Sequence, residues 1–203
     1  MAVLLLVSGC TVTSGSVGGW VAPWFADANV QSLAVFPFKH DSVPSEIALE
    51  FTDQVAAHLR ERSPDVEVVG PSEAAARLQA VNVMAEWERF LFTYLVSGIP
   101  DAVALGEVCD AVDIDALVHL ELATIVQRHR YYDRAGPIPA ANRVTVRAWM
   151  FDCVTAQPLW ELSSHGEIVR YTMRSGLPPE VSQPPPVVEG VKIAVEKLLP
   201  RLP

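Results

Sequence analysis

The stretch ALVHLELATIV, residues 116–126, decides the fold of this chain. Its apolar side chains recur at every second position, which is the period of a β-strand with one buried face. We therefore expect a long strand here. Its core face is predicted to consist of the even positions Val118, Leu120, Leu122, Thr124 and Val126.

The rest of the chain supplies further strands and amphipathic helices around this strand. Apolar residues spaced four apart mark a first helix, which begins near Ser42 or Pro44 and ends before Pro64. The expected order is strand 31–38, that first helix, strand 66–69, helices 73–80, 84–96 and 102–111, strands 116–126, 143–152 and 159–168, and helix 187–199. This order, β-α-β-α-α-α-β-β-β-α, predicts an α+β (α/β-like) fold with helices packed on a mixed sheet.

Length and composition limit the class of protein. The chain has 203 residues, half of them apolar, which is enough to bury the core of one domain. Its formal net charge of −9 argues against nucleic acid as the main partner, because such proteins need a basic surface to displace phosphate counterions. After the N-terminus, no apolar run reaches the ~18 residues of a membrane-spanning helix.

The N-terminal residues resemble a bacterial export signal for a lipoprotein. An apolar run at 2–7 is followed by Val7-Ser8-Gly9-Cys10, which resembles the lipobox that precedes a lipidated cysteine. We expect residues 1–9 to be a signal peptide. The Lys or Arg that usually precedes its apolar run is missing, so we expect that the start codon has been placed too far downstream. The other interpretation is a buried edge strand at 2–7 with Cys10 as an ordinary cysteine.

The residues after Cys10 are predicted to link the lipid anchor to the folded domain. Small residues dominate this stretch, so 10–30 is predicted to be the lipidated cysteine and a flexible tether, before a single domain over 31–199. A Pro-rich spacer is expected at 177–186. Thr11, rather than Asp, follows the cysteine, which by resemblance favours the outer membrane, with acyl chains such as palmitate as the anchor.

Two further cysteines, Cys109 and Cys153, leave two interpretations open. They form a disulfide if the compartment is oxidising, or they are both small buried apolar residues. Spacing alone does not decide between them, because a disulfide requires close Cα atoms.

Two features carry polar chemistry. His119 and Glu121 lie two apart on the face opposite the core, and Arg147 on the next strand has the parity to stand beside them. This set is either an acid–base or metal site, or a solvated or helix-covered sheet face with a cross-strand Glu–Arg pair. We favour the second interpretation and expect no catalytic, metal or cofactor site, because the sequence also lacks phosphate-loop, nucleophile-elbow and zinc-protease motifs.

The polar segment 127–139 is the second feature, and it is expected to be a loop. It is either the exposed end of a hairpin or a surface that contacts a partner, since Tyr and Arg are favoured at protein interfaces. The residues proposed for that contact are Arg128, Arg130, Tyr131, Tyr132 and Arg134.

Four phrases carry a resemblance to a family. SLAVFPF at 32–38, VEVVGPSEAAARL at 66–78, VDIDALVHLEL at 112–122 and VTVRAWMFDCVTAQPLW at 144–160 resemble bacterial envelope lipoproteins of the CsgG/LpoB/TolB-amino-terminal-like superfamily. The resemblance covers residues 31–199. It implies a lipid-anchored, non-catalytic protein facing the periplasm that binds another envelope protein. The alternatives are a structural subunit of an oligomeric envelope or secretion complex, with homo-oligomers, and a cryptic hydrolase.

Overall fold

A computed structural model describes residues 9–129, 131–133, 136–172 and 184–203. The fold is α+β, as predicted. The strands are β1 (Gly9–Val21), β2 (Ser32–Phe36), β3 (Glu67–Val69), β4 (Ala116–Arg128), β5 (Tyr131–Asp133), β6 (Gly136–Ile138), β7 (Ala140–Asp152) and β8 (Pro158–Thr172). The helices are α1 (Ser45–Arg62), α2 (Pro71–Ala80), α3 (Met84–Ser97), α4 (Ala102–Val112) and α5 (Val187–Leu198), with short 3-10 helices at Phe25–Asp27 and Leu199–Arg201.

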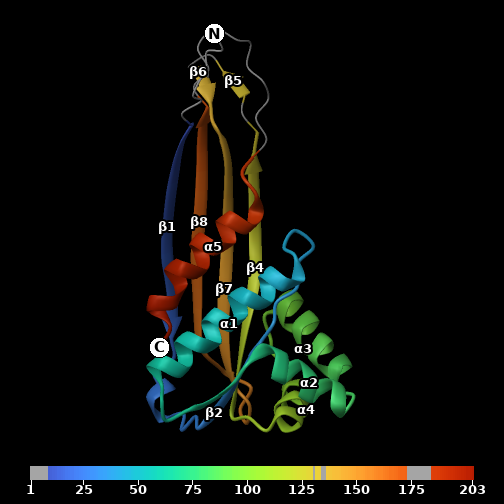
Figure 1. Ribbon diagram of the computed structural model, residues 1–203. Coiled ribbons are helices and arrows are strands. Elements are labelled where there is room, and N and C mark those ends of the chain that lie inside the picture. The colour runs from blue at the N-terminus through green and yellow to red at the C-terminus, as the bar shows by residue number, and fades with distance from the viewer. Residues whose placement is uncertain (1–8, 130, 134–135, 173–183) are drawn as a thin grey trace, which may run out of the picture.

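One mixed sheet organises the molecule. Six strands pair in the order β1-β8-β7-β4-β2-β3, and β5 pairs with β6 in a separate two-stranded ladder. The four long strands are antiparallel and extend well beyond β2 and β3, which run parallel to β4 at one end of the sheet (Figure 1). Only four residue pairs join β2 to β4, from Leu33–Ala116 to Phe36–His119.

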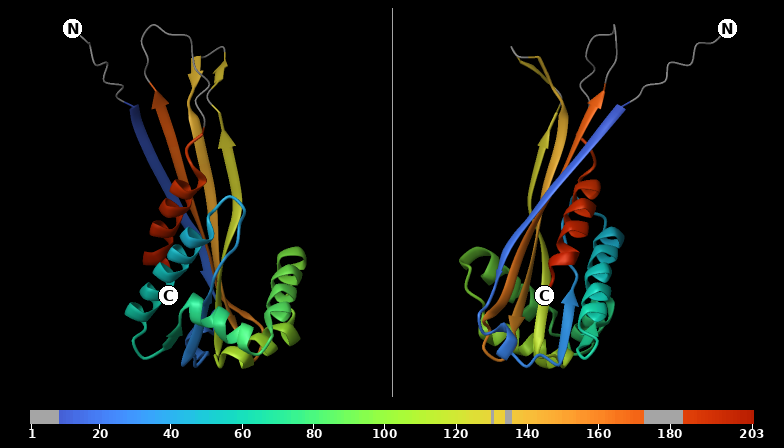
Figure 2. Two further views of the ribbon diagram at one scale, coloured as in Figure 1. Left: turned by 45° about the vertical axis from the view of Figure 1, so that its right-hand side comes forward. Right: turned by 90° about the vertical axis from the view of Figure 1, so that its left-hand side faces the viewer.

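Helices cover both faces of this sheet, unequally. α1 and α5 lie along one face and bury a large apolar core that includes Val35, Val118 and Trp160. α2, α3 and α4 gather over the other face only near the end that carries β2 (Figure 2), around a second core that includes Phe36, Phe90 and Phe151. The rest of that second face, beyond the part that α2, α3 and α4 cover, carries polar side chains.

α5 lies close to the sheet because two glycines face each other. A Cβ atom on Gly166 of β8 would overlap the Gly190 carbonyl oxygen and approach within 2.8 Å of the Ala194 nitrogen in α5. A Cβ atom on Gly190 would in turn lie 2.6 Å from the Val144 side chain. The absence of side chains at both positions therefore sets the separation of helix and sheet.

Cys109 at the end of α4 and Cys153 after β7 form a disulfide, with their Cα atoms 6.0 Å apart. This settles the question that spacing left open. The bond joins α4 to the turn between β7 and β8, across 44 residues of sequence.

The prediction of a flexible tether over residues 10–30 is wrong for its first half. β1 pairs with β8 along its whole length, from Gly9–Thr172 to Val21–Trp160. Small residues are compatible with an edge strand here because a side chain at Gly15 would collide with the His165 carbonyl oxygen and approach α5. The domain therefore begins with β1 rather than at residue 31, while the predicted signal peptide lies, up to residue 8, outside the described residues.

Two smaller predictions also need correction. A β-bulge between Leu122 and Thr124 reverses the parity of β4, so Thr124 and Val126 are exposed and Ile125 packs on the core instead. The expected loop 127–139 contains the end of β4 and the ladder β5–β6. Most of the Pro-rich spacer lies outside the described residues, and its last three residues lead into α5.

No helix in the described part of the chain is both long and apolar enough to cross a membrane.

Candidate functional site

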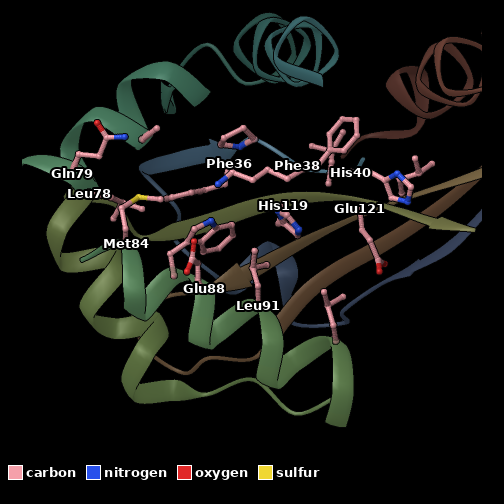
Figure 3. Close-up of a pocket in the computed structure, with 17 residues that line it drawn as sticks. Phe36, Phe38, His40, Leu78, Gln79, Met84, Glu88, Leu91, His119 and Glu121 are labelled. Carbon is pink, nitrogen blue, oxygen red and sulfur yellow. The ribbon is translucent and has the colours of Figure 1, made fainter. Parts of the chain in front are cut away.

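A pocket of about 410 Å³ lies where β2 ends. Its walls come from the end of β2 and the chain after it, from α2 and α3, and from the middle of β4 (Figure 3). Most of its surface is apolar, with Phe36, Leu78, Met84 and Leu91 among its lining residues. Enclosed, largely apolar pockets of this size with a few polar groups are the usual form of ligand sites.

His119 is the most buried polar residue of this pocket. Its side chain is only 5% exposed, and its ring stacks on Trp149 at 5.8 Å and meets Trp87 of α3 edge-on at 5.2 Å. Burial lowers the pKa of His119 to about 3, so the imidazole is neutral near pH 7. Its Nδ1 atom is buried and has no hydrogen-bond partner within the protein.

Glu121 lies two residues further along the same face of β4. It stands opposite Arg147 in the β4–β7 register, as the sequence predicted, and its Oε2 atom is buried without a hydrogen-bond partner. Burial raises the pKa of the Glu121 carboxyl, Arg147 lowers it, and Glu161 raises it again. Two of the residues that line the pocket, His119 and Glu121, therefore each have a buried polar atom without a partner within the protein.

α3 closes the site by packing aromatic rings on the sheet. Tyr94 meets Trp149 at 5.5 Å and Phe151 at 4.8 Å, both edge-to-face. Burial raises the pKa of the Tyr94 hydroxyl, and the nearby Glu161 raises it further. This cluster explains why His119 is buried rather than solvated. The sequence signal for it was Trp87 and Tyr94 on one face of the 84–96 helix, beside Trp149 on the sheet.

The arrangement has the features of a helix-covered sheet face, because Trp87 of α3 packs on His119 and Glu121 stands opposite Arg147. A general base works best with a pKa near the operating pH, and His119 is about 3 to 4 units below that range. Within the ranges that the structure describes, no three His, Cys, Asp or Glu side chains gather as metal ligands.

The predicted contact residues of segment 127–139 are only partly described. Arg128 is exposed at the end of β4, and its Nε donates a hydrogen bond to the Pro139 carbonyl at 3.2 Å. Tyr131 and Tyr132 belong to β5, although their side chains are outside the described part. Arg130 and Arg134 lie outside the described residues altogether.

Cys10 lies at the end of the sheet that carries these residues. Its backbone pairs with Tyr171, the neighbouring Arg170 pairs with Ala140, and Ala141 pairs with Arg128. The start of β1 and the β5–β6 ladder are therefore at the same end of the molecule, opposite the end covered by α2–α4 (Figure 1). The Cys10 side chain is outside the described part.

Comparisons with known proteins give structural similarities alone. No protein-family model matches the chain, and no curated protein has a similar sequence. Several solved structures are similar, among them the following three. The PelC dodecamer from Paraburkholderia phytofirmans is 11% identical, with a TM-score of 0.41, over 92% of this chain and 96% of that chain. Lipoprotein GNA1162 from Neisseria meningitidis is 16% identical, with a TM-score of 0.37, over 72% and 86%. Hypothetical protein CT253 from Chlamydia trachomatis is 11% identical, with a TM-score of 0.43, over 84% and 94%. No TM-score here reaches 0.5, so none of these similarities bears on what this chain does.

Proposed function

We propose that this protein is a lipid-anchored accessory lipoprotein of the bacterial envelope, which binds another envelope protein and does not catalyse a reaction. Acylated Cys10 would hold the domain on the outer membrane, facing the periplasm. The observation that carries this proposal is the lipobox-like Val7-Ser8-Gly9-Cys10, which ends where the paired strand β1 begins. Acyl chains would then leave directly from one end of the sheet, without a tether between anchor and domain.

Two features support the proposal from the folded domain. A disulfide between Cys109 and Cys153 is typical of proteins in oxidising compartments, which include the periplasm. Trp87 and Trp149 pack around His119 and bury its imidazole, which favours binding over catalysis at this position.

The test is membrane fractionation of the Cys10→Ala variant. We expect the variant to fold and to move from the membrane fraction to the soluble fraction, because two or three acyl chains provide most of the membrane affinity. Thr13→Ala is the matched control, since it also shortens one small side chain near the start of β1, where Thr13 is exposed, but leaves the anchor. Fractionation of Cys10→Ala that is the same as wild type would reject the proposal.

A second candidate function, the structural subunit of an oligomeric complex, is favoured by an apolar surface on α3 and α4. Phe92 and Val96 of α3 are 70% and 72% exposed, and Ile99 and Val103, which follow in the connection to α4 and in α4, are 68% and 66% exposed. Large exposed apolar patches usually mark protein or membrane contacts. Sedimentation across micromolar concentrations tests this candidate, and a strictly monomeric profile would count against it.

A further inference from the structure

β4 has an open edge beyond the point where β2 ends. β2 pairs with β4 only as far as Phe36–His119, because the next residue, Pro37, has no backbone N–H and the chain turns away. β4 continues for nine residues to Arg128, with β7 on one side only. No described strand pairs with its other side over that stretch. Nine residues give an edge of roughly 30 Å, with unpaired backbone groups at alternate positions.

The pocket extends from the space under α2 and α3 to this open edge. Four consecutive residues of β4, from His119 to Leu122, line it, although successive side chains of a strand point to opposite faces. A space in contact with all four must therefore run beside the strand backbone. Across the pocket, the five consecutive residues from Phe36 to His40 form the other wall. The pocket therefore lies beside β4 in the position that β2 would occupy if it continued past Pro37.

The two faces of this space differ in chemistry. On the α1 and α5 side, Leu120, Leu122 and Phe38 are buried apolar residues of the main core. On the α3 side, the His119 Nδ1 and Glu121 Oε2 atoms are buried without a partner. An ionised Glu121 carboxylate accepts hydrogen bonds, and Nδ1 accepts one in the Nε2–H tautomer of His119. An extended chain alternates its side chains between two such faces. An apolar residue fits the first face, and a residue with a donor group, Lys, Arg, Ser or Thr, fits the second.

We propose that the β4 edge, residues 120–128 with the adjoining pocket, binds an extended segment of a partner protein by strand addition, with one apolar side chain and one donor-bearing side chain entering the pocket. This inference rests on the proposed function and specifies how the partner would be bound. Main-chain hydrogen bonds to β4 would supply affinity, and the pocket would supply specificity. The β-bulge after Leu122 lies within this edge, so an added strand would follow the bend of β4 there.

The test measures binding of a synthetic nine-residue peptide to the full chain in detergent. The peptide alternates Val with Lys or Thr and is capped at both ends. Affinity is measured by fluorescence anisotropy, and protection of the β4 amides by hydrogen exchange. We expect binding together with slower exchange over residues 120–128. Two N-methylated versions of the peptide, one at odd and one at even residues, provide the control, because only alternate N–H groups of an added strand point at β4. One version is expected to lose at least ten-fold in affinity and the other to bind like the parent.

Several results would overturn the inference. They are no binding at millimolar peptide, equal binding of both N-methylated versions, and equal binding of a scrambled peptide with the same composition. Equal affinity of both N-methylated versions would indicate that the pocket takes a side chain or a small amphipathic molecule without strand addition.

A pair of variants tests the pocket contact. Glu121→Gln is expected to weaken binding of the peptide at least five-fold. Glu67→Gln, which makes the same change of charge at an exposed residue on β3, is not expected to weaken it. Equal effects of the two variants would contradict the assigned pocket contact. None of these measurements depends on the acyl anchor, so their failure is distinguishable from failure of the fractionation test.

Discussion

His119 shows how the surroundings of one residue decide its role. Taken alone, a His and a Glu two apart on a strand are compatible with acid–base chemistry. In the structure, the aromatic rings of Trp87 and Trp149 surround His119 and leave it 5% exposed. The cost of charging the imidazole in that environment keeps it neutral. What remains is a buried neutral imidazole whose Nδ1 has no partner within the protein, which suits hydrogen bonding to a bound group.

The burial of His119 makes a prediction for stability at low pH. Its pKa is about 3 in the folded protein, compared with 6.5 for an ordinary histidine. The unfolded chain therefore takes up a proton below about pH 6.5 that the folded protein refuses, and stability falls as the pH drops from 6.5 towards 3, by about 1.4 kcal/mol per pH unit. Between pH 7.5 and 4.5, His119→Phe should lose about 2–3 kcal/mol less unfolding free energy than wild type.

Urea unfolding at the two pH values measures this difference. His129→Phe is the matched control, because His129 is exposed and its variant should follow wild type. If His119→Phe lost as much stability as wild type between the two pH values, the histidine would not be buried in neutral form. Should the phenyl ring prove too large for the site, His119→Leu provides the same comparison.

Residue-level patterns predicted the faces of β4 up to the bulge and failed after it. Alternation placed Val118, Leu120 and Leu122 in the core, where the structure has them. The same rule assigned Thr124 to the core, but Thr124 instead donates a hydrogen bond to Thr145 on the other face at 2.7 Å. A bulge leaves no clear mark in the composition of a strand, because it is selected by pairing with the neighbouring strand.

Among the elements, α5 packs on the sheet through apolar residues and through one close contact between two glycines. Replacing Gly166 with Ala would place a methyl group against the Gly190 carbonyl and the Ala194 backbone. We expect this overpacking to cost about 1–3 kcal/mol of unfolding free energy, because helix and sheet would have to move apart.

Gly18→Ala is the matched control for this prediction. A Cβ atom at Gly18, on β1, would have no neighbour within 4 Å. Its effect on the urea midpoint should therefore be small. Equal midpoints for the two variants would show that α5 does not pack on β8 through these glycines.

The Cys109–Cys153 disulfide joins the helical layer to the strand hairpin. For a separation of 44 residues, the chain-entropy description predicts a contribution of about 4 kcal/mol. The double variant Cys109→Ala/Cys153→Ala should lose stability of that order in denaturant unfolding. Wild type in reductant should show the same loss, whereas reductant should leave the double variant unchanged. A wild-type midpoint that reductant does not move would contradict the bond.

The order of elements from 31 to 199 could be predicted from the sequence because those elements have clear apolar periods. β1 could not, since GCTVTSGSVGGWV contains few side chains larger than Val and no alternating apolar pattern. Its pairing with β8 is long-range, and small residues in an edge strand have the same composition as a flexible linker. β5 and β6 were missed for a related reason, because three-residue strands lie below the length at which a period is detectable.

At the scale of the whole molecule, the two ends of the sheet have different roles in this account. One end brings together Cys10, on β1, and the β5–β6 ladder. The other end carries β2, the helices α2–α4 and the pocket. A domain anchored through Cys10 would hold the pocket away from the bilayer, where it could meet a partner. The sequence indicated the anchor but not the pocket, because the pocket depends on where β2 stops relative to β4.

The proposed function depends above all on acylation of Cys10 at the start of the first strand. Mass spectrometry of the N-terminal peptide from the native protein, extracted from membranes, tests it most directly. We predict a peptide that begins at Cys10 and carries the added mass of a diacylglyceryl group. An N-terminal peptide that begins at Met1 and has no acyl group would contradict the account.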